Sequence, residues 1–205
     1  VYFASQFSVE SMALCIACSV LNIKCSEIQH GNIVRSSPLY NFSYAKERPN
    51  FFAKSFVVKN DMVKRVLLEV QRVESGNDVT VMPVNVKADL QSRSLLVCLG
   101  VTDIPGSVER FIVKSSNRKV IVRPHPGFKD LDVSAFENVT SLLKGKGVVF
   151  SENNSIDDDL SKASCILAGA STVIIDGCTS GHNIYTWDSR SLELYEEYKT
   201  LINLI

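Results

Sequence analysis

The stretch CILAGASTVIIDGCTSGHNIYT, residues 165–186, decides the fold of this chain. It begins with a continuous apolar run, Cys165–Ala168, which predicts a buried β-strand. A helix is predicted over Ser171–Thr179, and Asn183–Thr186 predicts a second strand. Apolar strands that alternate with helices are typical of a parallel sheet whose two faces are both covered.

The same alternation extends on both sides of this stretch. Upstream, strands are predicted at Ser94–Leu99, Lys119–Arg123 and Val148–Phe150, with helices at Ile104–Ser115 and Ile156–Ala163. Downstream, Ser189–Ile202 predicts a closing helix. We therefore expect an α/β protein in which residues 94–205 form a Rossmann-like parallel sheet.

The first part of the chain is less regular. Helices are predicted at Ser8–Leu21 and Asp61–Val73, strands at Lys24–Ile28, Phe52–Val58 and Val79–Val84, and a polar loop at Asn32–Asn50. The chain has no initiator Met, and a helix is already in progress at Phe7. We expect residues 1–50 to be the last helix and strand of a truncated N-terminal Rossmann-like domain with its loop. Residues 51–93 would then be a connecting strand–helix segment.

Composition excludes several classes of protein. With 45% hydrophobic residues the chain can build a core, and its 22 basic and 22 acidic side chains leave no broad positive footprint for nucleic acid. No apolar stretch reaches the roughly 20 residues that span a bilayer. The six cysteines are expected to be reduced core thiols, which suits a cytoplasmic protein.

The segment Arg123-Pro124-His125-Pro126 directly follows a predicted strand. Each proline biases the residue before it toward extended geometry, so His125 would project from the carboxyl end of the sheet. A histidine there can donate a hydrogen bond to a phosphate oxygen, and Arg123 would add positive charge. The alternative is a loop histidine without a ligand.

A second motif, Gly169-Ala170-Ser171-Thr172, lies between a predicted strand and a predicted helix. Its small residues would let a ligand approach the backbone, and a helix N-terminus favours an anion. The alternative is an ordinary Ser/Thr helix cap. Asp176 lies one turn further on the same face and could accept hydrogen bonds from ribose hydroxyls. Alternatively, it only complements the helix dipole.

Weaker signals complete the set. Gln29-His30-Gly31 ends a predicted strand, so His30 is a candidate general base or simply part of a turn. His182 is expected on the surface of a turn. The acidic run Asp157–Asp159 is expected to complement a helix dipole rather than to bind a metal. Trp187 is expected to pack between the last strand and the closing helix.

The order of these motifs resembles the donor domain of GT-B glycosyltransferases, over residues 7–31 and 94–188. The similarity is to bacterial enzymes that build capsule, lipopolysaccharide and O-antigen glycans. Some of these enzymes carry a strand end like Glu27–Gly31 in their first domain. Sialyltransferases and wall teichoic acid glycerophosphotransferases share the His-Pro and Ser/Thr pattern.

The resemblance implies a glycosyltransferase of bacterial surface polysaccharide synthesis, with a CMP- or UDP-linked donor and no metal or other cofactor. His125 would contact the donor phosphate, and Ser171 and Thr172 would bind the phosphate or the nucleotide. Asp176 would bind the ribose, and His30 would be the base. The acceptor would be a glycan or a lipid-linked molecule. The full-length enzyme would be cytoplasmic, with peripheral association at the inner face of the membrane.

The sequence departs from the family pattern at three places: Asp replaces Glu at 176, Gly177 replaces Ala, and Gly181-His182-Asn183 replaces Gly-Lys-Pro. One alternative is therefore a non-catalytic nucleotide- or glycan-binding or scaffold domain. An epimerase on the same fold would need further carboxylates, which the sequence does not show. Because the first domain would be nearly missing, we expect this fragment to be inactive alone.

Overall fold

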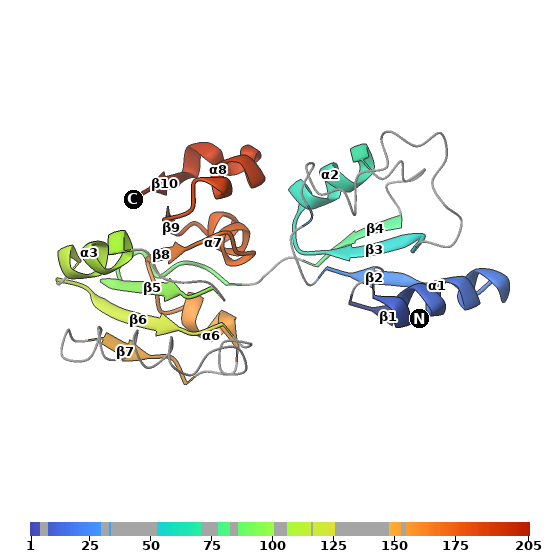
Figure 1. Ribbon diagram of the computed structural model, residues 1–205, viewed down its shortest axis with the longest axis horizontal. Helices are drawn as coiled ribbons and strands as arrows, with labels where there is room; N and C mark the ends of the chain where they lie inside the picture. The colour runs from blue at the N-terminus through green and yellow to red at the C-terminus, as the bar shows by residue number, and fades with distance from the viewer. Residues whose placement is uncertain are drawn as a thin grey trace. The chain divides into compact units, whose positions relative to one another are not determined.

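The computed structural model describes residues 1–4, 8–29, 33, 53–70, 78–82, 86–100, 106–115, 117–125, 148–152 and 155–205. The chain divides into two compact units, Val1–Val84 and Asn85–Ile205 (Figure 1). Each unit is built on a sheet whose paired strands are all parallel. The sequence predicted three segments, with boundaries after residues 50 and 93. The boundary between the two units lies after residue 84.

The first unit holds a four-stranded sheet in the order β1-β2-β3-β4. Its elements are β1 (Tyr2–Phe3), α1 (Val9–Val20), β2 (Ser26–Ile28), β3 (Ser55–Val58), α2 (Asp61–Val70) and β4 (Val79–Val81). Because β3 pairs with both β2 and β4, the predicted connecting strand is an inner strand of this sheet. Ser8 caps α1, since its side chain accepts a hydrogen bond from the Ser11 amide at 3.2 Å.

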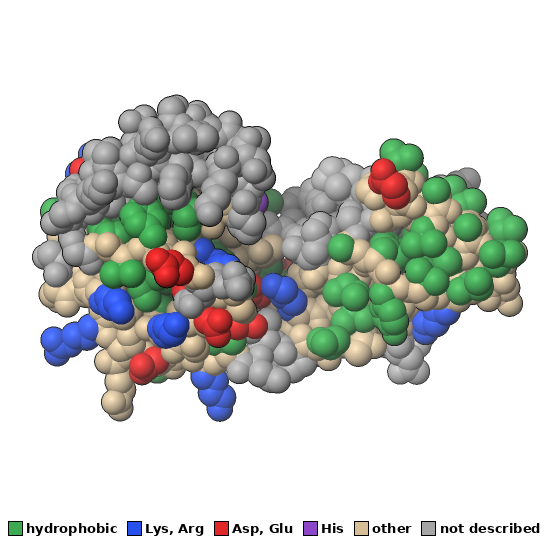
Figure 2. Space-filling model, turned by 90° about the horizontal axis from the view of Figure 1, so that it is seen from below, with side chains coloured by type: hydrophobic (Ala, Val, Ile, Leu, Met, Phe, Trp, Pro, Cys, Tyr) green, Lys and Arg blue, Asp and Glu red, His purple; other side chains and the backbone are tan. Residues whose placement is uncertain are grey.

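Helix α1 is apolar on two sides. Cys15 and Cys18 are buried against the sheet, whereas Val9 and Val20 on the outer side are 81% and 79% exposed. Figure 2 shows hydrophobic side chains gathered over the first unit in the view from below. A surface helix usually carries polar residues on its outer side. The outer side of α1 is therefore an exposed apolar surface.

The second unit holds a six-stranded sheet in the order β10-β9-β8-β5-β6-β7. Its strands are β5 (Ser94–Cys98), β6 (Lys119–Arg123), β7 (Val148–Phe150), β8 (Cys165–Ala168), β9 (Asn183–Thr186) and β10 (Ile202–Leu204). Its helices are α3 (Gly106–Lys114), α6 (Ile156–Leu160), α7 (Val173–Ser180), α8 (Arg190–Leu194) and the 3₁₀ helix η2 (Glu196–Leu201). Counted from β5 along the chain, the spatial order is 3-2-1-4-5-6, that of a Rossmann fold. The predicted fold class is confirmed.

Helices cover both faces of the second sheet. Val108 and Ile112 of α3 pack in the core cluster that contains Leu95, Val97 and Leu167. Successive strand residues point to opposite faces. Ile166 and Ile184, which lie against Gly177 of α7, therefore belong to the other face.

Gly177 lets α7 pack closely on the sheet. A Cβ atom at this position would lie 2.5 Å from the Cδ1 atoms of both Ile166 and Ile184, which are fully buried. The close packing of α7 against Ile166 and Ile184 therefore explains why this chain has glycine at 177, where the family pattern has alanine. Gly181, at φ 83°, ends the helix in the left-handed conformation that favours glycine.

The predicted closing helix over Ser189–Ile202 is wrong beyond Leu194. Tyr195, which is fully buried, leaves helical geometry at φ −116° and ψ 46°, and η2 leads into β10. Strand β10 pairs with β9, and the Asn203 side chain donates a hydrogen bond to the Ile184 carbonyl at 3.0 Å. Pairing with the edge of the sheet therefore overrides the local helical pattern.

Candidate functional site

The carboxyl ends of four strands lie side by side in the second unit. Cys98 at the end of β5 pairs in register with Arg123 of β6 and Ala168 of β8, and Ala168 pairs with Thr186 of β9. Because neighbouring strands are about 4.8 Å apart, this edge is about 14 Å wide from β6 to β9. The side chains that follow these strands can therefore meet one extended ligand.

The order of strands reverses between β5 and β8. The chain leaves β5 toward α3 on one face of the sheet, and leaves β8 toward α7 on the other face. Open α/β sheets bind ligands at the carboxyl ends of the strands, at the point where two such connections part. Residues 101–105, which enter α3, lie outside the described residues.

The N-terminus of α7 faces this carboxyl edge. Ser171 Oγ accepts a hydrogen bond from the Val173 amide at 3.4 Å, whereas Thr172 is already helical and makes no capping bond. In the described part of the chain, no backbone carbonyl accepts from the amides of Ser171 and Thr172. These N–H groups, two hydroxyls and the helix dipole together suit an anion.

His125 is exposed and follows the carboxyl end of β6, as predicted from its place after the strand. Its neighbours 126–147 lie outside the described residues. The register therefore brings His125 and the Gly169–Thr172 turn to the same edge of one sheet. The contact between His125 and a phosphate stays a prediction.

Arg123 is held by a buried carboxylate at this edge. Its Nη1 donates to Asp159 Oδ2 at 2.6 Å and to the Ser155 carbonyl at 3.2 Å, and Ser151 Oγ donates to Asp159 Oδ2 at 2.6 Å. The Asp159 side chain is 1% exposed and the Arg123 side chain 16%. The acidic run lies in the first turn of α6, as expected, and Asp159 in addition anchors Arg123.

Asp176 points toward the sheet and is 4% exposed. Burial raises the pKa of the nearby Cys98 thiol to about 12, an effect that Arg123 opposes and that Asp159 and Asp176 reinforce. The charges of Arg123, Asp159 and Asp176 therefore all act on the Cys98 thiol at the end of β5. A contact between Asp176 and ribose stays a prediction.

Gly169 has a reason for being glycine that the sequence did not reveal. A Cβ atom here would lie 3.0 Å from Cε2 and Cζ2 of Trp187. Trp187 packs on the face of the sheet that carries α3, whereas the Thr186 hydroxyl on the other face donates to Ser191 Oγ of α8 at 3.2 Å. The expectation that Trp187 packs against the closing helix is therefore wrong.

Of the two remaining histidines, the structure describes only His182. His30, the candidate base, lies outside the described residues. His182 was expected on the surface but is 6% exposed, and its Nε2 is 2.9 Å from the Leu160 carbonyl. The turn at Gly181 leads the chain toward the core, where the imidazole hydrogen-bonds to the carbonyl of Leu160, the last residue of α6. His182 is thus a structural residue.

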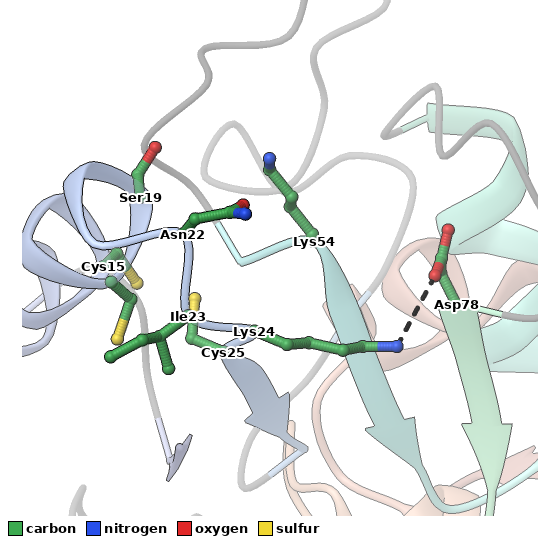
Figure 3. Close-up of a pocket in the computed structure, with 9 residues that line it drawn as sticks. Cys15, Ser19, Asn22, Ile23, Lys24, Cys25, Lys54 and Asp78 are labelled. Atoms are coloured by element: carbon green, nitrogen blue, oxygen red, sulfur yellow. Dashed lines mark ion pairs between the residues drawn. The ribbon is translucent and has the colours of Figure 1, made fainter.

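A cavity of about 300 Å³ lies in the first unit, outside this edge (Figure 3). Its residues Lys24, Lys54 and Asp78 precede β2, β3 and β4, so it opens at the amino ends of these strands. Cys15, Cys18 and Cys25 line it as buried free thiols, and burial raises the Cys15 pKa to about 12. The predicted burial of these three cysteines is confirmed.

In the part of the chain that the structure describes, no group of three or more His, Cys, Asp or Glu side chains is placed to hold a metal ion. Among the described helices, none is long and apolar enough to cross a membrane.

Comparison with protein-family models and with curated proteins finds no match. Solved structures do match. The UDP-GlcNAc 2-epimerase of Methanocaldococcus jannaschii, in complex with UDP-GlcNAc and UDP, aligns with a TM-score of 0.56 and 16% identity over 100% of this chain. A putative UDP-N-acetylglucosamine 2-epimerase of Listeria monocytogenes aligns with a TM-score of 0.55 and 15% identity, also over 100% of this chain.

The chain has a GT-B type fold. It spans 64% and 61% of the length of these two structures. The wall teichoic acid polymerase TagF also aligns, with a TM-score of 0.47 and 11% identity over 86% of this chain. At these identities the comparisons establish the fold, and the site rests on the residues described above.

Proposed function

We propose that the carboxyl edge of the second sheet binds the nucleotide of a nucleotide sugar. We propose further that the full-length protein is a glycosyltransferase of bacterial surface polysaccharide synthesis. The observation that carries the proposal is the N-terminus of α7, which lies beside the reversal of strand order. Among the described residues, no backbone carbonyl accepts a hydrogen bond from its Ser171 and Thr172 amides. The solved structure with UDP-GlcNAc and UDP bound has the same fold, which supports a ligand of this class.

Each residue has a distinct part in this proposal. Ser171 and Thr172 bind a phosphate through their amides and hydroxyls, and His125 donates a hydrogen bond to the same group from the end of β6. Arg123, anchored by Asp159, contributes positive charge at the end of the same strand. Asp176 binds the ribose, and Gly169 belongs to the turn that aims α7 at the phosphate.

The proposed transfer needs no metal ion. When the bond between sugar and phosphate breaks, negative charge develops on the leaving phosphate. Fixed N–H donors at a helix terminus, together with His125, stabilise this charge without having to reorganise. His30 is the proposed base that takes the proton of a glycan or lipid-linked acceptor. The donor is proposed to be CMP- or UDP-linked.

The test of binding compares two threonines of one helix. Calorimetry and thermal shift are measured with CMP, UDP, GDP and CDP. Thr172→Val removes a hydroxyl that makes no capping bond, so we expect a folded protein that binds about 5- to 150-fold more weakly, the scale of a lost hydrogen bond of 1–3 kcal/mol. Thr179→Val, at the opposite end of α7, is the control; its hydroxyl donates to the Ile175 and Asp176 carbonyls, so the variant can lose stability but should retain affinity.

His125→Ala is tested in the same way, with Lys119→Ala at the other end of β6 as its control. We expect a loss of about 1–3 kcal/mol of binding free energy for His125→Ala, because a charge-assisted hydrogen bond is removed. Unchanged nucleotide affinity would remove His125 from the site. Binding of none of the four nucleotides would favour the scaffold alternative.

An epimerase of nucleotide sugars is a second candidate, because both structures with the higher TM-scores are described as UDP-GlcNAc 2-epimerases. Incubation of the full-length protein with UDP-GlcNAc separates the two reactions. Epimerisation needs no acceptor and inverts one carbon of the sugar, which proton NMR detects. Transfer releases UDP only when an acceptor is present.

A further inference from the structure

We propose that the indole of Trp187 is a wall of this site and contacts the ring, base or sugar, that adjoins the bound phosphate. The inference rests on the proposed function. Trp187 directly follows β9, and the register of Ala168 with Thr186 brings it beside Gly169, directly after β8. The indole thus stands next to the turn whose end carries Ser171 and Thr172.

The contact with Gly169 locates the ring closely. Cε2 and Cζ2 of the indole lie 3.0 Å, and Nε1 lies 3.1 Å, from the point where a Cβ atom of residue 169 would stand. Two residues of chain span at most about 7 Å, which bounds the distance between the Cα atoms of Gly169 and Ser171. A phosphate on the Ser171 amide therefore has its neighbouring ring within reach of the indole.

The indole rests on a packed support. Tyr185 lies two residues earlier on the same strand face, and its ring centroid is 4.9 Å from that of Phe111. All three aromatic rings pack against the core cluster of β5, α3 and β8. A tryptophan held in this way offers a large contact surface and loses little conformational freedom when a ligand binds.

The indole is only half-buried, so it keeps surface for a ligand. In the described part of the chain, no oxygen accepts a hydrogen bond from its Nε1–H. A tryptophan at the edge of a core usually packs its carbon face and directs its N–H to a polar partner. The ring of a nucleotide sugar supplies both a stacking surface and an acceptor.

The chain has one tryptophan, so its fluorescence reports on this position alone. UDP and UDP-GlcNAc are titrated against the native chain while emission and acrylamide quenching are recorded, with calorimetry in parallel. We expect a saturable change in emission with the calorimetric Kd and protection from acrylamide. A response to UDP assigns the contact to the base or ribose, and a response to UDP-GlcNAc alone assigns it to the sugar.

Variants separate contact from mere proximity. Trp187→Leu should weaken calorimetric binding about 5- to 150-fold, the range expected when a stacking contact of 1–3 kcal/mol is lost. Trp187→Phe keeps a ring but removes the N–H and should lose less. Phe150→Leu, at the end of β7, is the aromatic control and should retain affinity.

The outcomes also distinguish this inference from the proposed function. Calorimetric binding of UDP or UDP-GlcNAc without a fluorescence change, or with unchanged affinity in Trp187→Leu, would overturn the role of Trp187. The nucleotide site itself would then stand. If UDP-GlcNAc and all four nucleotides (CMP, UDP, GDP and CDP) fail to bind the native chain by calorimetry, the proposed function and this inference both fail.

Discussion

Removal of the charge of Asp159 tests whether the second sheet depends on one buried ion pair. In Asp159→Asn the side chain keeps its shape and can still accept from Ser151 Oγ, but Arg123 loses its counter-ion. Breaking one side of a buried pair costs about 3–5 kcal/mol, because the remaining charge is left uncompensated. The Arg123 side chain is 16% exposed and also bonds the Ser155 carbonyl, so we expect the lower end, about 3 kcal/mol.

This loss is measured by thermal and guanidinium unfolding followed through Trp187. As the chain's sole tryptophan, it lies in the second unit and reports on that unit. At about 4 °C per kcal/mol for a unit of this size, Tm should fall by about 12 °C. The double variant Arg123→Met/Asp159→Leu replaces both charges by apolar groups and should recover most of the loss.

A second ion pair of the same unit, whose arginine is exposed and whose Asp188 side chain is 14% exposed, provides the control. Arg190 Nη2 and Asp188 Oδ2 are 2.7 Å apart, close to the 2.6 Å of the buried pair, but the Arg190 side chain is 75% exposed. Solvent screens such a pair, so Arg190→Met should leave Tm nearly unchanged. A loss below about 1 kcal/mol in Asp159→Asn, or no recovery in the double variant, would refute the importance assigned to burial.

Three further predictions concern stability. Gly177→Ala should destabilise the second unit in thermal unfolding, because about 1–3 kcal/mol of overpacking exceeds the helix propensity gained, about 1 kcal/mol; an unchanged or higher Tm would contradict this. His182→Leu should cost about 0.5–1.5 kcal/mol in guanidinium unfolding, because the Leu160 carbonyl loses one of its two donors and keeps the Ala163 amide, and an unchanged stability would contradict this. In the folded protein the pKa of Cys98 is raised to about 12, so the thiol loses its proton at a lower pH in the unfolded chain than in the folded one. The free energy of unfolding should therefore fall as pH rises from about 9 toward 12. This fall should be shallower in Cys98→Ala.

The regular part of the second unit could be predicted from sequence because its signals are local. The strands Lys119–Arg123, Val148–Phe150, Cys165–Ala168 and Asn183–Thr186 have the predicted bounds. Each is an apolar or β-branched run next to a turn, and this pattern depends only on neighbouring residues. The position of Arg123, His125 and the Gly169–Thr172 turn after such strands follows from the same information.

The structure decided the features that depend on residues far apart in sequence. Strand β10 forms because its residues can pair with the edge strand β9. The three residues Ile202–Leu204 show no periodicity that would predict a strand. The partners of Arg123, His182 and Gly169 are 36, 22 and 18 residues away along the chain. Buried polar groups must be paired, and the chain finds those partners only after the strands are ordered.

The sequence by itself thus determined that α7 begins with hydroxyl and amide groups at a carboxyl strand end. A helix N-terminus leaves its first amides unpaired wherever it occurs, so this property is local. Only the tertiary structure placed β8 beside β5, set Trp187 against Gly169 and buried Asp159 under Arg123. These contacts depend on the order in which strands pair, which is settled by the packing of the whole sheet and not by any one segment.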